Sequence, residues 1–419
     1  MTPSSLWRDA DFLKLWTGQT VSEFGSVVTR TALGLVALLT LGAGPAEMAY
    51  LVVAASSGVL LVGLLAGAWV DRLPRRPVLI WTDVIRAGLL FSIPAAAAAG
   101  TLRIEQLYVV AFLEACLGTL FDSAYHAYLP SLVGVDRLLA GNAKLSQSSA
   151  IAEVGGPGLA GALVQVAGAP FAILVDAVSF VVSAVSLLAI RAREAPRPRE
   201  LRQTIGREIV EGLRFVRHHS LVFPIAASSV SEHFFGSFYA ALYSLYLLKV
   251  LGLSPLLLGI VISAGGVGSL VGATFAGRVV QRIGIGRSIL VMMLASSAIG
   301  ILTPLASGPL FVATLMVFLP QLIGDGMNTI EWVARDTVVQ TAVPDRVLGR
   351  VNATLDVVSH GAAPFGALVA AAIAESFGVR TAMGIAWLGM LASVLFIFFS
   401  PLARVRSLDA ISASRSSAP

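Results

Sequence analysis

The chain has 419 residues, of which 56% are hydrophobic and only 13% are charged, and its mean hydropathy is +0.84. A soluble domain carries about 25% charged residues, so this composition excludes a soluble protein. The single cysteine, Cys116, excludes an intramolecular disulfide. The net charge of +5 does not indicate nucleic-acid binding, because most of the cations gather in loops on one side of the expected helices.

The sequence contains twelve segments that are long and apolar enough to be membrane helices, since about 20 mostly apolar residues cross the hydrocarbon core. They lie near 14–40, 48–70, 77–100, 106–130, 145–168, 171–190, 221–248, 256–277, 288–305, 309–333, 351–374 and 381–402. We therefore expect an all-α integral membrane protein with twelve transmembrane helices in two pseudo-symmetric six-helix bundles. The bundles are expected at 1–190 and 221–403, with a linker at 191–220 between them and a disordered cytoplasmic tail at 404–419.

The loop after the second expected helix reads Gly67-Ala-Trp-Val-Asp71-Arg72-Leu-Pro-Arg75-Arg76. Asp71 and the three arginines can form an ion-pair cluster that breaks when the cytoplasmic mouth opens, and charge anchoring of the loop is the simpler interpretation. Asp83 and Arg86 follow at i,i+3 spacing, so they can pair with each other or with this cluster. We interpret these residues as part of the conformational machinery.

The fifth expected helix contains Gly155-Gly156-Pro157-Gly158. Small residues let neighbouring membrane helices approach closely, and proline removes a backbone donor and permits a kink. Gly156 and Pro157 therefore join the residues that we expect to serve packing and hinge motion.

The linker at 191–220 is the only long polar stretch in the chain. From Thr204 it has a helical pattern, with Ile205, Ile209, Leu213 and Val216 on one face and arginines beside them. This pattern indicates an amphipathic helix on the anionic inner leaflet, and a plain tether is the alternative.

The loop cations are distributed unequally between two sides. If the N-terminus, the even-numbered loops and the C-terminus share one side, that side holds eight arginines between Arg191 and Arg217 and most of the other loop cations. The opposite side holds only Arg103, Lys249 and Arg380. The positive-inside rule then places both termini in the cytoplasm, with the chain in the cytoplasmic membrane.

The second half repeats the first. Val21-Ser22-Glu23 recurs as Val230-Ser231-Glu232 at a shift of 209, and Gly67 to Arg72 recurs in degraded form as Gly277 to Arg282. At the same shift Asp122 corresponds to Glu331. Two related halves in one apolar chain are a common design of membrane carriers.

Several acids lie inside the expected membrane helices, where a charge is costly and usually functional. A carboxyl among apolar groups stays protonated to a higher pH than one in water, so it can exchange a proton as its access to water alternates. A structural ion pair is the alternative, above all for Glu331, which has Arg335 at i+4. The proton-coupling candidates are Glu23, Asp122, Glu153, Glu232, Asp325 and Glu331.

The loop motif at 67–76 resembles the signature of the major facilitator superfamily, and the glycine-proline motif at 155–158 is similar to that of its exporters. Phe121 to Pro130 and Phe12 to Gly25 resemble a branch that includes enterobactin exporters, macrolide efflux pumps and multidrug–proton antiporters. The resemblance covers the whole chain and implies that helices 1, 4, 7 and 10 line a central cavity. Two positions depart from it, since Ser26 replaces a frequent acid and the arginine of the helix 4 motif is absent.

Aromatic and polar side chains on these helices indicate the substrate class. Tyr239 and Tyr243 follow Glu232 along one stripe, a pattern that suits bulky amphipathic molecules, although an aromatic stripe also occurs in ordinary helix packing. Arg30 lies two turns after Glu23 and can hold a neighbouring acid charged or bind an anionic group. The substrate-cavity candidates are Arg30, Tyr125, Tyr239, Tyr243, Gln321 and Asn328.

These features predict a secondary active exporter of small amphipathic molecules, coupled to proton antiport. A dedicated exporter of a siderophore, another natural product or a lipid is the first alternative, and a non-transporting scaffold or sensor is the second. The sequence contains no P-loop and no metal or nucleophile cluster, so we expect neither an enzyme nor a cofactor or metal. The expected partners are the substrate, protons and membrane lipids, with no nucleic acid, and the chain is expected to be a monomer.

Overall fold

The computed structural model describes the backbone of residues 6–70, 73–192 and 205–407, and the side chains of these ranges except 64–70, 135 and 205–210. Asp71 and Arg72 of the loop motif therefore lie outside the described residues. The same holds for residues 193–204 of the linker and for residues 408–419 of the tail that we expected to be disordered.

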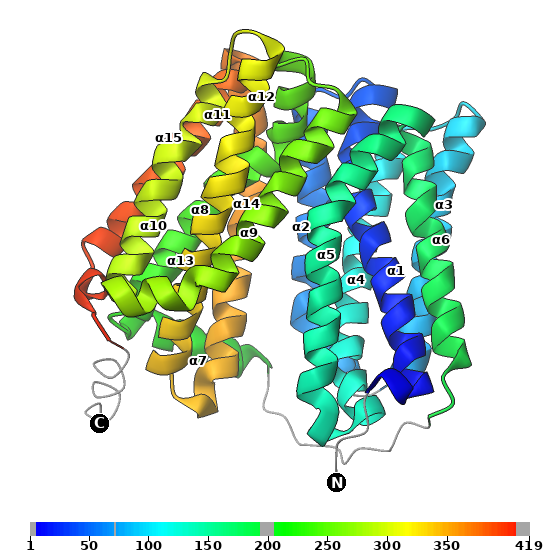
Figure 1. Cartoon of the computed structure of the whole chain (residues 1–419), viewed down its shortest axis with the longest axis horizontal. Helices are drawn as coiled ribbons and strands as arrows, with labels where there is room; N and C mark the ends of the chain where they lie inside the picture. Colours follow the sequence, from blue (N-terminus) through cyan, green and yellow to red (C-terminus); the bar gives the residue numbers. More distant parts are fainter. Residues whose placement is uncertain (1–5, 71–72, 193–204, 408–419) are drawn as a thin grey trace. The chain divides into compact units, whose positions relative to one another are not determined.

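All regular structure in the described residues is helical, and the chain forms two compact units. The first comprises Met1–Arg199 with Ser254–Ser263, and the second comprises Glu200–Leu253 with Ala264–Pro419. The helices of the first unit are α1 (Ala10–Leu35), α2 (Pro45–Val70), α3 (Arg75–Ala98), α4 (Ile104–Val133), α5 (Val135–Ala167) and α6 (Ala169–Ala189). Those of the second are α7 (Ile205–His218), α8 (Val222–Leu245), α10 (Ile285–Gly300), α11 (Leu302–Leu305), α12 (Leu310–Leu319), α13 (Asp325–Ala342), α14 (Asp345–Phe377) and α15 (Val379–Phe398), while α9 (Pro255–Ile283) contributes to both (Figure 1).

Eleven helical segments among the described residues are long and apolar enough to cross a membrane. Each of the twelve segments expected from the sequence falls on a helix, but the one near 221–248, which forms α8, is not among the eleven. Its middle turns contain Glu232, His233 and several serines, which lower its hydropathy. The chain is thus a multi-pass, all-helical membrane protein.

The backbone repeats at a shift of 210. Short π-helical segments at Val36–Thr40 and Tyr246–Val250 extend α1 and α8. The turns that follow contain Gly42 at φ 72° and Gly252 at φ 73°, a left-handed conformation that glycine adopts without strain. This agreement in backbone detail supports the internal repeat read from the sequence.

In the first unit, α1 packs against α5 and α6 through small residues. A side chain at Gly18 would collide with Ser186 of α6, and one at Gly25 would collide with Ser179 and Asp176. Close approach at such small residues is a main source of helix association in membranes. These contacts fix the position of α1 relative to α6.

In the second unit, α8 packs against α14 and α15. Gly366 of α14 lies against the backbone oxygen of Phe234, so only glycine fits there. The amphipathic helix expected in the linker is present as α7, and it packs along the start of α14. There Arg350 donates to Glu211 at 2.5 Å, and Gly212 lies against the Arg350 carbonyl.

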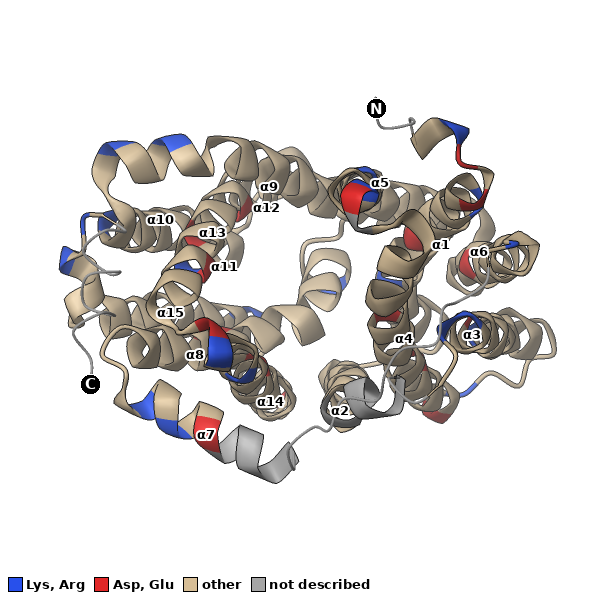
Figure 2. Ribbon diagram, turned by 90° about the horizontal axis from the view of Figure 1, so that it is seen from below, with Lys and Arg blue, Asp and Glu red and all other residues tan. Residues whose placement is uncertain are grey.

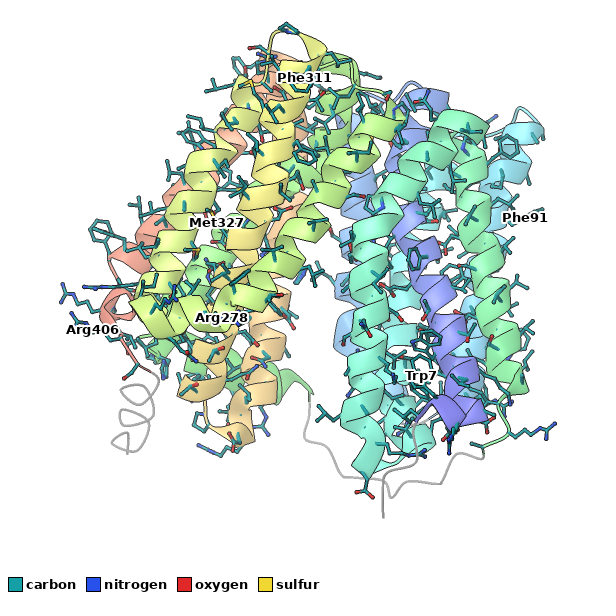
Figure 3. The ribbon with its side chains drawn as sticks, in the orientation of Figure 1. Trp7, Phe91, Arg278, Phe311, Met327 and Arg406 are labelled. Atoms are coloured by element: carbon teal, nitrogen blue, oxygen red, sulfur yellow. The ribbon has the colours of Figure 1, made fainter. Side chains whose placement is uncertain are left out.

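Large apolar side chains point outward from both units. Phe91 of α3 is 57% exposed and Phe311 of α12 is 78% exposed, and Figure 3 shows both extending away from their helices. Exposed apolar surface on this scale is unfavourable in water. Lipid covers such surface at no comparable cost, as expected of membrane helices.

Candidate functional site

The first unit brings together five residues proposed from the sequence. Arg30 of α1 forms a salt bridge with Glu153 of α5, and their side chains are 61% and 50% exposed. Glu23 is half-buried and lies within electrostatic range of Arg30, Glu153 and Asp122. Tyr125, on α4, lies within the same range of Glu23 and Asp122. Three helices of this unit thus contribute to one group of polar side chains.

Glu23 and Asp122 differ from most of the other candidate acids, because neither forms a hydrogen bond or salt bridge with any residue that the structure describes. His126 stands at i+4 from Asp122 and is exposed, and its ring makes an edge-on contact with the ring of Tyr125. A carboxyl without a fixed partner gains or loses a proton without breaking an ion pair. This arrangement suits a group that exchanges protons.

The second unit contains a corresponding cluster, in which two candidate acids are paired with an arginine. Arg335 of α13 donates to both carboxyl oxygens of Glu232, at 2.8 and 2.5 Å, and forms a salt bridge with Glu331 one turn before it. The hydroxyls of Ser228 and Ser393 also donate to Glu232, at 3.1 and 3.3 Å. The side chains of Arg335 and Glu331 are only 7% and 9% exposed. One buried arginine therefore holds two of the candidate acids.

The repeat explains the contrast between the two groups. At the shift of 209, Glu232, Glu331 and Arg335 correspond to Glu23, Asp122 and His126. Glu23 and Asp122 lie on α1 and α4 of the first unit, and Glu232 and Glu331 lie on α8 and α13 of the second. Figure 2 colours all acidic residues of the described helices red. The acids are kept in both halves, but the strong cation is present only in the second. The pairing of Arg335 with Glu331 was an alternative read from the sequence, whereas its pairing with Glu232 was missed.

A buried ion pair inside the first unit was also missed. Arg86 of α3 donates to Glu114 of α4 at 2.8 and 2.5 Å and lies 4.0 Å from the centroid of the Phe180 ring. The expected pairing of Arg86 with Asp83 is thus replaced by one with Glu114. Asp83 and Asp176 are fully buried near this pair. The signal in the sequence was Glu114, an acid in the fourth expected helix, and the arginine that pairs with it lies on α3.

A second polar group in the second unit surrounds the π-helical segment Pro320–Gly324. Asp325 lies near Asn328, and Tyr243 of α8 lies near Gln321 and Asp325. Tyr239 packs on Tyr243 with ring centroids 6.1 Å apart. A pocket of about 250 Å³ opens beside them, lined by Ser269, Asp325, Asn328, Thr329 and Trp332. The structure thus brings Tyr239, Tyr243 and Gln321 close to Asp325 and Asn328, but of these five residues only Asp325 and Asn328 line the pocket.

The described arginines of the loop motif, Arg75 and Arg76, bind backbone carbonyls of other helices. Arg76 donates to the carbonyl oxygens of Leu187 and Leu188 at 3.0 and 2.9 Å, at the end of α6. Arg75 is buried and donates to the carbonyl oxygen of Ala127 at 3.1 Å. The last carbonyls of a helix lack helical partners, so Arg76 satisfies terminal carbonyls of α6, whereas Arg75 reaches a carbonyl inside α4. Both bonds tie the start of α3 to these helices. Gly67 lies within α2, in the part of that helix whose side-chain surroundings the structure does not describe.

Gly156 and Pro157 lie in the middle of α5. A side chain at Gly156 would overlap Val27 of α1, so this contact requires glycine. The contact lies three residues before Arg30 and three after Glu153 along their helices. The small residue therefore sets the distance across which Arg30 and Glu153 meet.

A separate cavity of about 680 Å³ lies at the start of α1, lined by Arg8, Asp9, Ala10, Asp11, Lys14, Arg137 and Arg191. Its charges are largely paired with each other. Arg137 lies 3.0 Å from Asp9, and Lys14 lies 2.8 Å from Asp11. A polar cavity at the helix ends does not suit an apolar molecule, so we do not assign it to transport.

Comparison with known proteins places the chain in a family. A family model described as transmembrane secretion effector matches residues 1–419. The chain is 28% identical to the multidrug efflux pump Tap of Mycolicibacterium fortuitum over 366 residues, which is 84% of this chain and 86% of that protein. It is 23% identical to the uncharacterized MFS-type transporter YvqJ of Bacillus subtilis (strain 168) over 343 residues, covering 79% and 78% of the two chains.

Among solved structures, a bacterial homologue of the iron transporter ferroportin in its inward-facing state aligns with a TM-score of 0.75. The alignment covers 94% of this chain and 99% of that one at 19% identity, which shows a common fold. The chain therefore belongs to the transmembrane secretion effector family of major facilitator superfamily transporters, which are not enzymes.

Proposed function

We propose that the protein is a secondary active exporter that moves small amphipathic molecules out of the cell in exchange for protons. The single observation that carries this proposal is that Glu23 and Asp122 have no hydrogen-bond or salt-bridge partner among the described residues and lie near the exposed Arg30–Glu153 salt bridge. The relative named a multidrug efflux pump supports the direction of transport.

We infer that the chain has twelve spans in two six-helix bundles, with α8 as the twelfth. Its 24 residues extend about 36 Å at 1.5 Å per residue, which is enough to cross the hydrocarbon core. Its only acid, Glu232, is neutralised by Arg335. Following the distribution of loop cations, both termini face the cytoplasm, and the linker helix α7 lies on that side.

We propose that the two halves have different roles in transport. Substrate and protons compete for Glu23 and Asp122, with Arg30, Glu153 and Tyr125 beside them. Glu232 and Glu331 hold the second bundle together through Arg335 and take up protons only if that cluster opens. Asp325, with Tyr239, Tyr243, Gln321 and Asn328, forms the wall that receives a bulky and cationic substrate.

The cluster at Arg86 gives the proposal a structural basis for motion. Asp83, Arg86 and Glu114, together with the loop residues Gly67 to Arg76, are proposed to hold α3 and α4 in one arrangement while the bundles rock. Gly156 and Pro157 supply the close contact and the kink point in α5.

The test uses everted membrane vesicles in which respiration pumps protons into the interior, with the fluorescent cation ethidium as the transported probe. Vesicles with the protein should accumulate ethidium when the interior is acidic and should release it when a protonophore is added. The E23Q/D122N variant should lose this accumulation. The E105Q variant is the matched control, because Glu105 is an exposed acid at the first turn of α4. Accumulation that persists with the protonophore contradicts proton coupling.

A further inference from the structure

The rings of His233 and His360 are in contact within the second unit. His233 is half-buried on α8 and His360 is exposed on α14. Their ring centroids lie 4.7 Å apart, with the ring planes at 61°. The tight packing of α8 against α14 at Gly366 holds the two rings together. Neither histidine has a role in the exchange of substrate for protons proposed above.

The hydrogen bonds of the two rings fix which nitrogen is available. Nδ1 of His233 lies 2.8 Å from the carbonyl oxygen of Ser229, and Nδ1 of His360 lies 2.9 Å from that of Asp356. A carbonyl only accepts, so each Nδ1 donates, and a neutral ring then carries its lone pair on Nε2. Within the part of the chain that the structure describes, neither Nε2 has a hydrogen-bond partner.

This arrangement is the one that metal-binding histidines use. Such a histidine binds the ion through one ring nitrogen and donates the other N–H to a carbonyl or carboxylate, which fixes its tautomer and orientation. With metal–nitrogen bonds of about 2.0–2.1 Å, two imidazoles on one tetrahedral ion have centroids about 5 Å apart. The observed 4.7 Å lies within reach of that value by small rotations of the rings.

Charged groups of both signs lie near the two rings. Glu232 precedes His233 in the chain and, like Arg335, lies within electrostatic range of its ring, and Arg335 also holds Glu331. No cluster of three or more histidine, cysteine or acidic residues occurs among the described residues. An ion held by the two imidazoles therefore keeps positions open for water or for a transported molecule, as exchangeable metal sites do.

We propose that His233 and His360 form a two-histidine site for a divalent transition-metal ion of the zinc, nickel or cobalt class, bridging α8 and α14. Imidazole nitrogen is a preferred ligand of these ions, whereas Mg²⁺ prefers oxygen. The site is independent of the export proposal, because its occupancy is measured at equilibrium without transport. Either proposal can fail while the other stands.

The experiment is a calorimetric titration of the full-length protein in detergent, with its purification tag removed. Ni²⁺ is the probe, and Mg²⁺ is the control for selectivity between metal ions. The wild type should bind one Ni²⁺, and H233Q and H360Q should each weaken binding by at least about tenfold. The matched control is H218Q. His218 makes the same Nδ1 bond, 2.8 Å from the Arg214 carbonyl oxygen, but has no histidine ring stacked on it among the described contacts.

A second measurement tests the bridge. Ni²⁺ should raise the melting temperature of the wild type and of H218Q, but not that of H233Q or H360Q, because only an ion bound to both helices stabilises their contact. His360 is exposed, so H360Q is expected to fold, and it decides the question even if H233Q does not. Affinity unchanged in H360Q, equal binding of Mg²⁺, or no binding at about 1 mM overturns the proposal.

Discussion

Arg335 holds Glu232 through both terminal nitrogens, at 2.8 Å from Nη1 to Oε2 and 2.5 Å from Nη2 to Oε1. This bidentate pair joins α13 to α8 inside the second unit, and Glu331 completes it from the preceding turn. The same two places in the first half hold His126 and Glu23, which do not meet in this way. The halves differ at two of these three positions, with Glu331 in place of Asp122 and Arg335 in place of His126, and only the second half contains the arginine that pairs the acids.

We expect R335Q to lower the free energy of unfolding by about 3–5 kcal/mol, because it leaves the buried carboxyl of Glu331 and the partly buried carboxyl of Glu232 without their cation. The E232Q/R335Q double variant should recover part of this loss, since one of the carboxyls is then neutral. Thermal unfolding in detergent measures both effects. H126Q is the control at the equivalent position, and it should melt close to the wild type. If R335Q melts as the control does, Arg335 does not hold the cluster together.

Two ion pairs in the first unit should differ in strength because they differ in burial. The side chains of Arg86 and Glu114 are 11% and 17% exposed, against 61% and 50% for Arg30 and Glu153. Double-mutant cycles with glutamine should give a coupling of about 0.2–1 kcal/mol for the exposed pair and a clearly larger one for the buried pair. Equal couplings would mean that the burial of Arg86 does not determine its role.

Replacement of Gly156 by alanine should force α1 and α5 apart, because the new methyl group overlaps Val27. Overpacking of this kind costs about 1–3 kcal/mol, and we expect G156A to unfold at lower temperature. V27A in the same chain should restore part of the loss, because it removes the Cγ1 atom that lies closest to the new methyl group but keeps the Cβ atom at 2.7 Å. G88A is the matched control, since Gly88 of α3 has open space around it. Failure of V27A to rescue G156A would place the strain elsewhere.

Asp325 is expected to select for positive charge in the pocket beside Asn328 and Trp332. D325N should raise the KM for ethidium several-fold in everted vesicles and should change that for an uncharged amphiphile far less. D336N is the control on the same helix, because Asp336 is bonded to Gln340 at 2.7 Å and lies outside the pocket. An equal rise for both substrates would indicate a packing defect rather than charge recognition.

Much of the fold can be predicted from local patterns in the sequence. Runs of apolar residues located the helices, and the recurrence of Glu23 as Glu232 supported a duplicated design. The amphipathic helix α7 was also predicted, from the spacing of Ile205 to Val216. These features depend on residues near one another in the chain, where spacing alone determines which side chains share a face.

The partners of the charged residues were harder to predict. Glu331 and Arg335 stand at i,i+4, so their contact follows from helix geometry. Glu232 with Arg335, Glu114 with Arg86, and His233 with His360 each join two helices that are distant in sequence. Such contacts depend on how each helix is rotated, which is set by packing at residues such as Gly366 and Gly25. The sequence of a single helix does not determine how that helix is rotated about its own axis.

The most direct test of the account uses proteoliposomes that contain E23Q/D122N, wild type or E105Q, with ethidium exchange and ethidium accumulation measured in the same preparation. The account predicts that E23Q/D122N still exchanges ethidium across the membrane but no longer accumulates it in response to an imposed pH gradient, while E105Q does both. Accumulation by E23Q/D122N at the wild-type level would show that the proton is carried elsewhere and would contradict the account.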